Sequence, residues 1–191
     1  MQPYTYSTDK AGGRGRETLF KVTFRNQINL IQIADNKANM IISINSIIIS
    51  VIVSITGIGS FSTGLESSVN IMIPVVLIVL TCLSSVVYAI QAARPHLIKD
   101  KQKTGFVKSG KSSILFFGNI SKMTMDEYMD DMDNLLNSRE AIYKNMTIDI
   151  YNQGKVLQRK YNLLSIAYLI FMYGFVFSVL TFLVMFVIPS V

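Results

Sequence analysis

Residues 40–61 read MIISINSIIISVIVSITGIGSF, an apolar run that contains no Asp, Glu, Lys or Arg. Two later runs share this property: residues 71–93 (IMIPVVLIVLTCLSSVVYAIQAA) and residues 164–188 (LSIAYLIFMYGFVFSVLTFLVMFVI). A bilayer core of about 30 Å needs roughly 20 helical residues, and each run meets that length. The sequence therefore predicts an integral membrane protein in which these three runs are transmembrane helices.

The positive charges are distributed unevenly around the three spans. The 18 Lys and Arg residues all lie before the first span or between the second and the third, and none lies in residues 62–70. Lys and Arg concentrate on the cytoplasmic side of membrane proteins. We therefore expect residues 1–39 and 94–163 to be cytoplasmic, and the 62–70 loop and the C-terminus to be extracytoplasmic. The net charge of +6 follows from this topology, and we expect no nucleic-acid polymer as a partner.

The segment before the first span divides into a tail and a helix. Residues 1–16 are polar and rich in Gly, Ser and Thr, which predicts a disordered tail. From Glu17 a helical pattern continues into the first span without Gly or Pro, so residues 17–39 are predicted to form a cytoplasmic helix. The fold class is thus an all-α membrane protein with helical cytoplasmic extensions.

The segment between the second and third spans carries further helix signals. Residues 114–117 (ILFF) form a short apolar run that predicts either a short strand or hairpin, or a packed turn. Thr124-Met125-Asp126-Glu127 fits a capping box and predicts a helix through Leu136. Another helix is expected to begin near Ser138 and to continue into the third span, with Gly154 as its weakest point.

A polar stripe follows one face of the first helix into the membrane. Its members alternate in spacing between four and three residues, which keeps them on one helical face: Arg25, Asn29, Gln32, Asn36, Asn39, Ser43, Ser46 and Ser50. A lipid-facing surface gives no reason for such a stripe, so its serines should face protein or water. They either pack against another helix or line a water-filled path in a homo-oligomer. Asn45 raises the same question, because a buried Asn seeks a partner and an interhelical partner favours self-association.

A charged cluster lies about one turn before the first span. Asp35, Asn36 and Lys37 are flanked by Ala34 and Ala38, whose small side chains leave room for another helix or a ligand. In a structural interpretation, Lys37 extends to the lipid headgroups, and Asp35 pairs with it or with a basic residue of the second cytoplasmic segment. In a functional interpretation, the cluster holds a phosphate or a nucleotide base.

Three stretches of the chain resemble the Pycsar transmembrane effector family. They are residues 25–45 (RNQINLIQIADNKANMIISIN), residues 115–118 with 125–128 (LFFG and MDEY), and residues 150–157 with 160–161 (IYNQGKVL and KY). The similarity covers about residues 20–185, and its specific part is ADNKA at residues 34–38.

The resemblance implies a bacterial antiphage effector of the inner membrane. In such systems a pyrimidine nucleotide cyclase makes cyclic CMP (cCMP) or cyclic UMP (cUMP) upon infection, and the effector senses it and damages the membrane, which causes abortive infection. The segment 94–163 would then be the cytoplasmic sensor. We expect the chain to form a homo-oligomer. We expect no enzymatic activity, because the phosphohydrolase domain of some relatives is missing from this sequence. We expect no cofactor or metal, since the chain has one cysteine, Cys82, and one histidine, His96.

The chemistry of a cyclic mononucleotide suggests candidate binding residues. Its phosphate needs a cation or N–H donors, and its base needs amide-type groups at the edge and an aromatic ring on the face. Side chains of these types are Arg25, Asn29, Asp35, Asn36, Lys37, Tyr151, Lys155 and Lys160, with Tyr128 and Tyr143 as further aromatic candidates. A site between the two cytoplasmic segments would couple binding to helix rearrangement.

Three alternative functions remain open at this point. The effector could respond to a cyclic dinucleotide, or the chain could be a holin-like or small channel-forming protein without a ligand. Residues 105–112 (GFVKSGKS) also match the Walker A pattern of ATPases. A phosphate loop follows a buried strand and opens a helix, whereas these residues follow a lysine-rich segment and precede the apolar run at 114–117. We therefore predict a flexible basic loop there.

Overall fold

The computed structural model describes residues 10–62, 69–95, 113–115, 120–121 and 123–187. The chain divides into two units, each of which is described by itself. The extramembrane unit comprises Met1–Ile31 and His96–Leu157, and the membrane unit comprises Gln32–Pro95 and Gln158–Val191.

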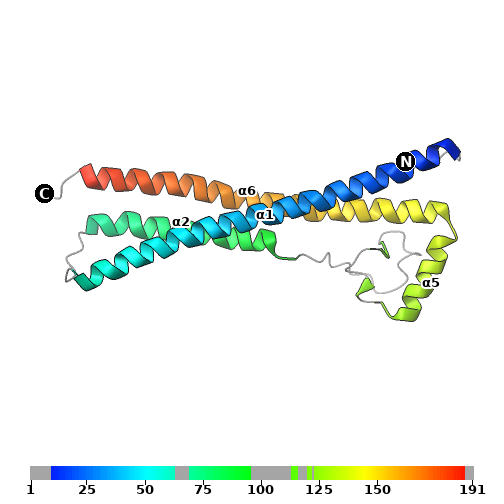
Figure 1. Cartoon of the computed structure of the whole chain (residues 1–191), viewed down its shortest axis with the longest axis horizontal. Helices are drawn as coiled ribbons and strands as arrows, with labels where there is room; N and C mark the ends of the chain where they lie inside the picture. The colour runs from blue at the N-terminus through cyan, green and yellow to red at the C-terminus, as the bar shows by residue number, and fades with distance from the viewer. Residues whose placement is uncertain (1–9, 63–68, 96–112, 116–119, 122, 188–191) are drawn as a thin grey trace, which may run out of the picture. The chain divides into compact units, whose positions relative to one another are not determined.

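Four helices can be followed along their length in the described residues (Figure 1). Helix α1 (Lys10–Ser62) and helix α6 (Arg139–Val187) each run from the extramembrane unit into the membrane unit. Helix α2 (Val69–Ala93) belongs to the membrane unit, and helix α5 (Met125–Leu136) belongs to the extramembrane unit.

The prediction of an all-α protein with three transmembrane helices is confirmed. Helices α1, α2 and α6 are each long and apolar enough to cross a membrane. The part of the chain that the structure describes contains no strand. Ile114 and Leu115, the first two residues of the short apolar run, form a turn, and the other two lie outside the described residues, as do the Walker-like residues 105–112.

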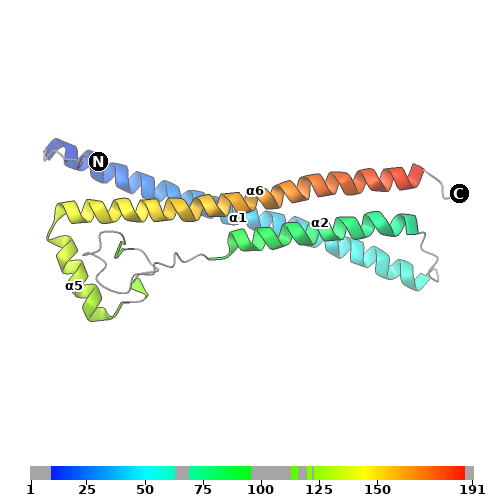
Figure 2. The same cartoon turned by 180° about the vertical axis from the view of Figure 1, so that it is seen from behind.

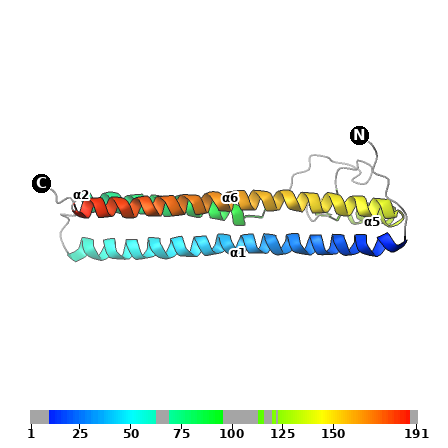
Figure 3. The same ribbon diagram turned by 90° about the horizontal axis from the view of Figure 1, so that it is seen from above.

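Helix α1 is longer than its sequence predicts. It begins at Lys10 instead of Glu17, so residues 10–16, which the sequence predicts as disordered, are helical. This part contains three glycines, Gly12, Gly13 and Gly15, which lower its helix propensity. The sequence therefore does not predict a helix there. The whole helix comprises 53 residues without interruption (Figure 3).

Helices α5 and α6 begin where their capping signals predict. The backbone N–H of Glu127 donates to Thr124 Oγ1 at 3.3 Å, and the Thr124 N–H donates to Glu127 Oε2 at 3.0 Å, which completes the capping box. After a sharp turn (Figure 2) α6 begins at Arg139, where the hydroxyl of Ser138 accepts from the Ala141 N–H at 3.3 Å. Gly154, the predicted weak point, does not interrupt this 49-residue helix.

Small side chains pack the three helices of the membrane unit together. The buried residues of this core come from all three helices: Ala38, Ile41, Ala89, Ala92, Leu164 and Ala167. Gly174 of α6 meets α2 so closely that an added Cβ would lie 2.2 Å from Thr81 Cγ2. Helices in lipid associate through such close contacts, because lipid tails are as apolar as the side chains themselves.

A short series of hydrogen bonds also links the same three helices. Asn45 of α1 donates through Nδ2 to Ile41 O at 2.8 Å and, over a longer 3.5 Å contact, to the Ser85 hydroxyl of α2. Ser85 in turn donates to the carbonyl of Ala167 on α6 at 2.9 Å. The buried Asn45 therefore finds a partner within its own chain.

Aromatic and polar contacts join the helices of the extramembrane unit. The rings of Phe20 on α1 and Tyr143 on α6 stack with centroids 5.7 Å apart, and the Arg16 guanidinium lies 5.4 Å from the Tyr143 centroid. The fully buried Ile114 donates its N–H to Asn145 Oδ1 at 3.1 Å, which attaches the turn to α6. These contacts fix the register of α1 against α6 within this unit.

Candidate functional site

An ion pair within the membrane unit uses two of the predicted ligand-binding residues. Asp35 of α1 pairs with the ammonium of Lys160 on α6. Lys160 is only 7% exposed, whereas the Asp35 side chain keeps 38% of its surface exposed. The sequence left Asp35 with two predicted partners, Lys37 and a basic residue of the second cytoplasmic segment, and the structure shows the second. The space beside the adjacent Ala34 and Ala38 is filled, because both are buried.

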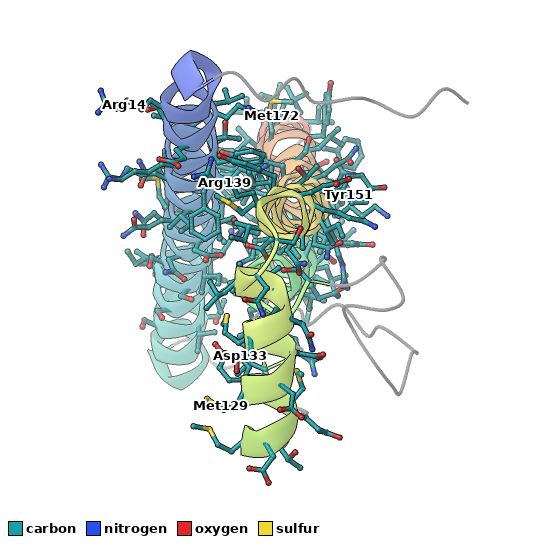
Figure 4. The ribbon with its side chains drawn as sticks, turned by 90° about the vertical axis from the view of Figure 1, so that its right-hand side faces the viewer. Arg14, Met129, Asp133, Arg139, Tyr151 and Met172 are labelled. Atoms are coloured by element: carbon teal, nitrogen blue, oxygen red, sulfur yellow. The ribbon has the colours of Figure 1, made fainter. Side chains whose placement is uncertain are left out.

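The other predicted ligand-binding residues are exposed on the two long helices. Tyr151 and Lys155 contact each other on α6, with the ammonium 4.6 Å from the ring centroid. Tyr151 is 61% exposed and projects from α6 on the side away from α1 (Figure 4). Among the described side chains, the remaining four form no hydrogen bond or ion pair with the other candidates: Arg25, Asn29, Asn36 and Lys37.

The polar stripe of α1 does not pack against the other described residues of the chain. Every one of its eight members, from Arg25 to Ser50, is exposed. The face that α1 buries in the membrane unit is a neighbouring one, which carries Ala34, Ala38, Ile41 and Asn45. Of the membrane residues singled out by sequence, Asn45 therefore belongs to the packed core, whereas Ser43, Ser46 and Ser50 remain open to lipid, to water or to other copies of the chain.

A group of buried hydrogen-bond acceptors in the extramembrane unit was not predicted from the sequence. Asp149 of α6 is 7% exposed, and its Oδ2 accepts from Gln153 Nε2 at 3.2 Å. Three buried oxygens have no hydrogen-bond partner among the described residues: Asp149 Oδ1, Gln153 Oε1 and Gln27 Oε1. We call Gln27, Asp149 and Gln153 the acceptor cluster. It belongs to the extramembrane unit, and Asp149 precedes the apolar run at 164–188 by about four helical turns.

The members of the acceptor cluster lie at similar levels along the two helices, but Asp149 lies about 140° around α6 from Gly154, the residue that Gln27 approaches. The Phe20–Tyr143 stack sets the register. Gln27 follows Phe20 by about two turns of α1, and Asp149 and Gln153 follow Tyr143 by between one and three turns of α6. Gln27 Nε2 lies 3.6 Å from the position of a Cβ on Gly154, the residue next to Gln153. The missing side chain of Gly154 thus leaves space beside Gln27.

Burial changes the acid–base behaviour of Asp149. Loss of solvation raises the pKa of its carboxyl, and the hydrogen bond from Gln153 lowers it in part. Asn145 and Gln153, one turn before and after Asp149, carry no charge, and neither does Gln27 on α1. A buried acceptor without a donor costs stability, and most native proteins avoid it. The unpaired oxygens of the acceptor cluster are therefore expected to lower the stability of the extramembrane unit.

One sequence signal points to this group. Asp149 is the only acidic residue after Glu140, although the 141–160 segment carries four Lys and Arg residues. Asn145, Asp149 and Gln153 are also spaced four apart, which places them on one face of a helix. Periodicity alone does not show that this face is buried, because the burial depends on the register with α1.

A comparison with family models assigns most of the chain to a known protein family. The model PycTM, described as the Pycsar effector protein domain, matches residues 19–187 and so includes both units. Comparisons with curated proteins and with solved structures found no significant match. The match confirms the resemblance seen in the sequence. The chain belongs to the Pycsar effector family, and its role is that of an antiphage defence effector.

Proposed function

We propose that this chain senses cCMP or cUMP in the cytoplasm and then disrupts the integrity of the inner membrane, which causes abortive infection. The family places the chain in a cyclic-nucleotide signalling context at a membrane. In this proposal the chain acts through binding and rearrangement and catalyses no reaction. A pyrimidine nucleotide cyclase supplies the ligand.

The observation that carries the proposal is the continuity of α1 and α6. Each is an unbroken helix that begins in the extramembrane unit and ends in the membrane unit. A ligand that shifts or rotates these helices in the first unit therefore moves the same helices in the second, without an intervening loop. Small shifts of packed helices are an established way to transmit the effect of ligand binding from one part of a protein to another.

The exposed polar stripe supplies the second part of the proposal. A monomer in lipid would expose the hydroxyls of Ser43, Ser46 and Ser50 to acyl chains. Ser46 satisfies its own donor by bonding to Ile42 O at 2.7 Å, but its oxygen remains available. In a homo-oligomer these side chains would face other copies or a water-filled path. We propose that ligand binding brings this face of α1 into such a path.

Dye entry into living cells tests the proposal. Cells that express the chain together with a pyrimidine cyclase should take up a membrane-impermeant dye, and cells that express either protein alone should exclude it. Dye entry without any cyclase would support the holin-like alternative, and entry only with a cyclic-dinucleotide synthase would support that ligand instead. ATP turnover that Lys111→Ala abolishes would support the ATPase alternative.

Lys37 is the exposed cation next to the packed start of the membrane unit, and we expect it to bind the ligand phosphate. Lys160, the nearby alternative on α6, already neutralises Asp35. Lys37→Ala should therefore weaken nucleotide binding by the purified protein and leave its thermal unfolding unchanged. Lys21→Ala, which removes another exposed cation from α1, is the matched control. An unchanged affinity in Lys37→Ala would remove Lys37 from the site.

A further inference from the structure

Helix α5 has an acidic side without a partner among the described residues. The charged residues of this helix are all acidic, and Glu127 is used by the capping box. Three exposed carboxylates form no hydrogen bond or ion pair with another described residue, and their spacing places them on one side of the helix: Asp126, Asp130 and Asp133. Like charges so placed repel each other, so this side favours a partner that brings cations.

An apolar stripe adjoins the acidic side of α5. It consists of Met125, Met129 and Leu136, which lie in one line along the helix and are each more than half exposed. The helix packs through a different side, where Leu135 is buried. Contiguous apolar side chains that stay exposed outside a membrane mark contact surfaces for other molecules. A lipid surface fits poorly, because helices that lie on lipid are rich in Lys and Arg.

The first turns of α1 carry the complementary surface. Residues 14–25 contain four Lys and Arg residues and one acid, Glu17. Three of the cations are exposed on one side of the helix and form no ion pair with another described residue: Arg14, Lys21 and Arg25. Figure 4 shows Arg14 projecting from α1 on the side away from α6. Leu19 and Val22, which lie beside these cations, are each more than half exposed.

The two surfaces match in length and lie in the same unit. Asp126 to Asp133 and Arg14 to Lys21 each cover seven helical steps, or about 10.5 Å. Both surfaces belong to the extramembrane unit, and α5 lies at the level of the first turns of α1 (Figures 1 and 3). Because both are exposed in the single chain, they do not cover each other. A second copy with the same orientation in the membrane presents its basic surface at the level of α5.

We infer that α5 of one copy binds the basic side of α1 on a second copy, with the acids opposite the cations and the apolar stripe against Leu19 and Val22. The inference rests on the proposed function, whose homo-oligomer it supplies with an interface, but the association itself needs no nucleotide. Two different surfaces meet, so each added copy leaves one of each kind open for the next. Such head-to-tail contacts close into rings when the rotation permits, and a ring is the arrangement that a shared water-filled path requires.

Charge reversal tests the inference on the detergent-solubilised full chain without nucleotide, with light scattering to measure the molecular mass over a range of concentrations. The α1-reversed chain carries Arg14→Glu and Lys21→Glu, and the α5-reversed chain carries Asp130→Lys and Asp133→Lys. Each alone should associate at least about tenfold more weakly than the wild type, because like charges then face each other. All four positions are exposed, so circular dichroism should show unchanged helix content.

Mixing the two reversed chains separates contacts between copies from contacts within one chain. In an equimolar mixture, the acidic α5 of the α1-reversed chain meets the basic α1 of the α5-reversed chain, and the two other reversed surfaces also carry opposite charges. The mixture should therefore associate about as strongly as the wild type. A mixture that stays dissociated would mean that α5 pairs with basic residues of its own chain, and it would overturn the inference.

The matched control reverses two other exposed cations of the same unit. Arg139→Glu with Lys144→Glu on α6 changes the net charge as the α1-reversed chain does, and it should associate as the wild type does. A monomeric wild type, or reversed chains that associate at full strength, would overturn the inference. Neither result touches the proposed function, which fails only if a pyrimidine cyclase does not trigger dye entry.

Discussion

The two units treat a buried charge in opposite ways. In the membrane unit the buried ammonium of Lys160 has a carboxylate partner, Asp35. In the extramembrane unit the buried carboxylate of Asp149 has only an amide neighbour, and one of its oxygens has no partner among the described residues. A paired buried charge fixes one arrangement of helices, whereas an unpaired one favours any arrangement or ligand that supplies a donor. The extramembrane unit should therefore be the easier of the two to rearrange.

The same contrast holds for the other buried polar groups. Ser85 and Ser178 of the membrane unit each donate to a backbone carbonyl. Among the described residues, one buried oxygen of this unit lacks a partner, Asn45 Oδ1, whereas the extramembrane unit has three such oxygens. In the described residues, the buried polar groups of the membrane unit are thus more completely hydrogen-bonded than those of the extramembrane unit.

The largest expected effect comes from the tightest contact of the membrane unit. In Gly174→Ala the new Cβ would lie 2.2 Å from Thr81 Cγ2, and the β-branched Thr81 side chain has little freedom to move away. We expect a loss of about 3 kcal/mol in the free energy of unfolding, the upper end of the usual cost of overpacking, measured by thermal unfolding in detergent.

Two further variants show whether this contact is the cause. Thr81→Ala combined with Gly174→Ala should recover most of the lost stability, because it removes the clashing atoms. Gly57→Ala, which meets no atom within 4 Å, should cost nothing. If Gly174→Ala were as stable as the wild type, the helices of the membrane unit would not be as closely packed as described.

A smaller effect is expected from the ion pair, and it should be asymmetric. Asp35→Asn leaves the ammonium of Lys160 buried without its countercharge and should cost about 2 kcal/mol. Lys160→Met removes the buried charge, retains most of the apolar stem, and leaves a carboxylate that is already partly in water. It should therefore cost less. Equal losses in the same unfolding assay would mean that the burial of Lys160 does not matter.

The smallest effect should be a gain in stability. Because the pKa of Asp149 is raised in the folded chain, its contribution to stability is greatest below the pKa of the unfolded chain, about 3.9. The contribution is lost as the pH rises through the raised folded value. At neutral pH Asp149→Asn should be more stable by about 1 kcal/mol, or roughly 2–4 °C in Tm.

Measurement over pH separates this explanation from a general effect of the substitution. The difference in Tm between Asp149→Asn and the wild type should shrink as the pH falls toward 4. A difference that stays constant with pH would show that the carboxyl is not strained by its burial, and the contrast between the two units would lose its electrostatic basis.

The fold could be predicted from the sequence wherever the signal is local. Uncharged length defines the three spans, and the Thr124–Glu127 capping box defines the start of α5. The predicted start of α1 was wrong, because three glycines near Lys10 lower the local helix propensity. Tertiary contacts such as that of the Arg16 guanidinium with the Tyr143 ring compensate for this loss.

The candidate site could be predicted only in part. For Asp35 the sequence left open an ion pair with Lys37, an ion pair with the second segment, or a ligand site, and the structure shows the ion pair with Lys160. Asp149 and Gln27 were missed because the burial of their oxygens depends on tertiary packing, which the residue pattern of a single helix does not reveal. The regular spacing of the polar stripe predicted a face of α1 in contact with protein or water. In the structure, α1 packs through the neighbouring face, which carries Ala38 and Ile41.

Release of a dye from liposomes that contain the purified chain tests most directly whether the chain couples nucleotide binding to membrane disruption. We predict that cCMP or cUMP triggers release by the wild type. Lys37→Ala should insert equally well but need about tenfold more nucleotide for the same release, since a hydrogen bond to a charged group is worth about 1.5–3 kcal/mol. Release that is independent of nucleotide, or identical dose–response curves for the two proteins, would contradict this coupling.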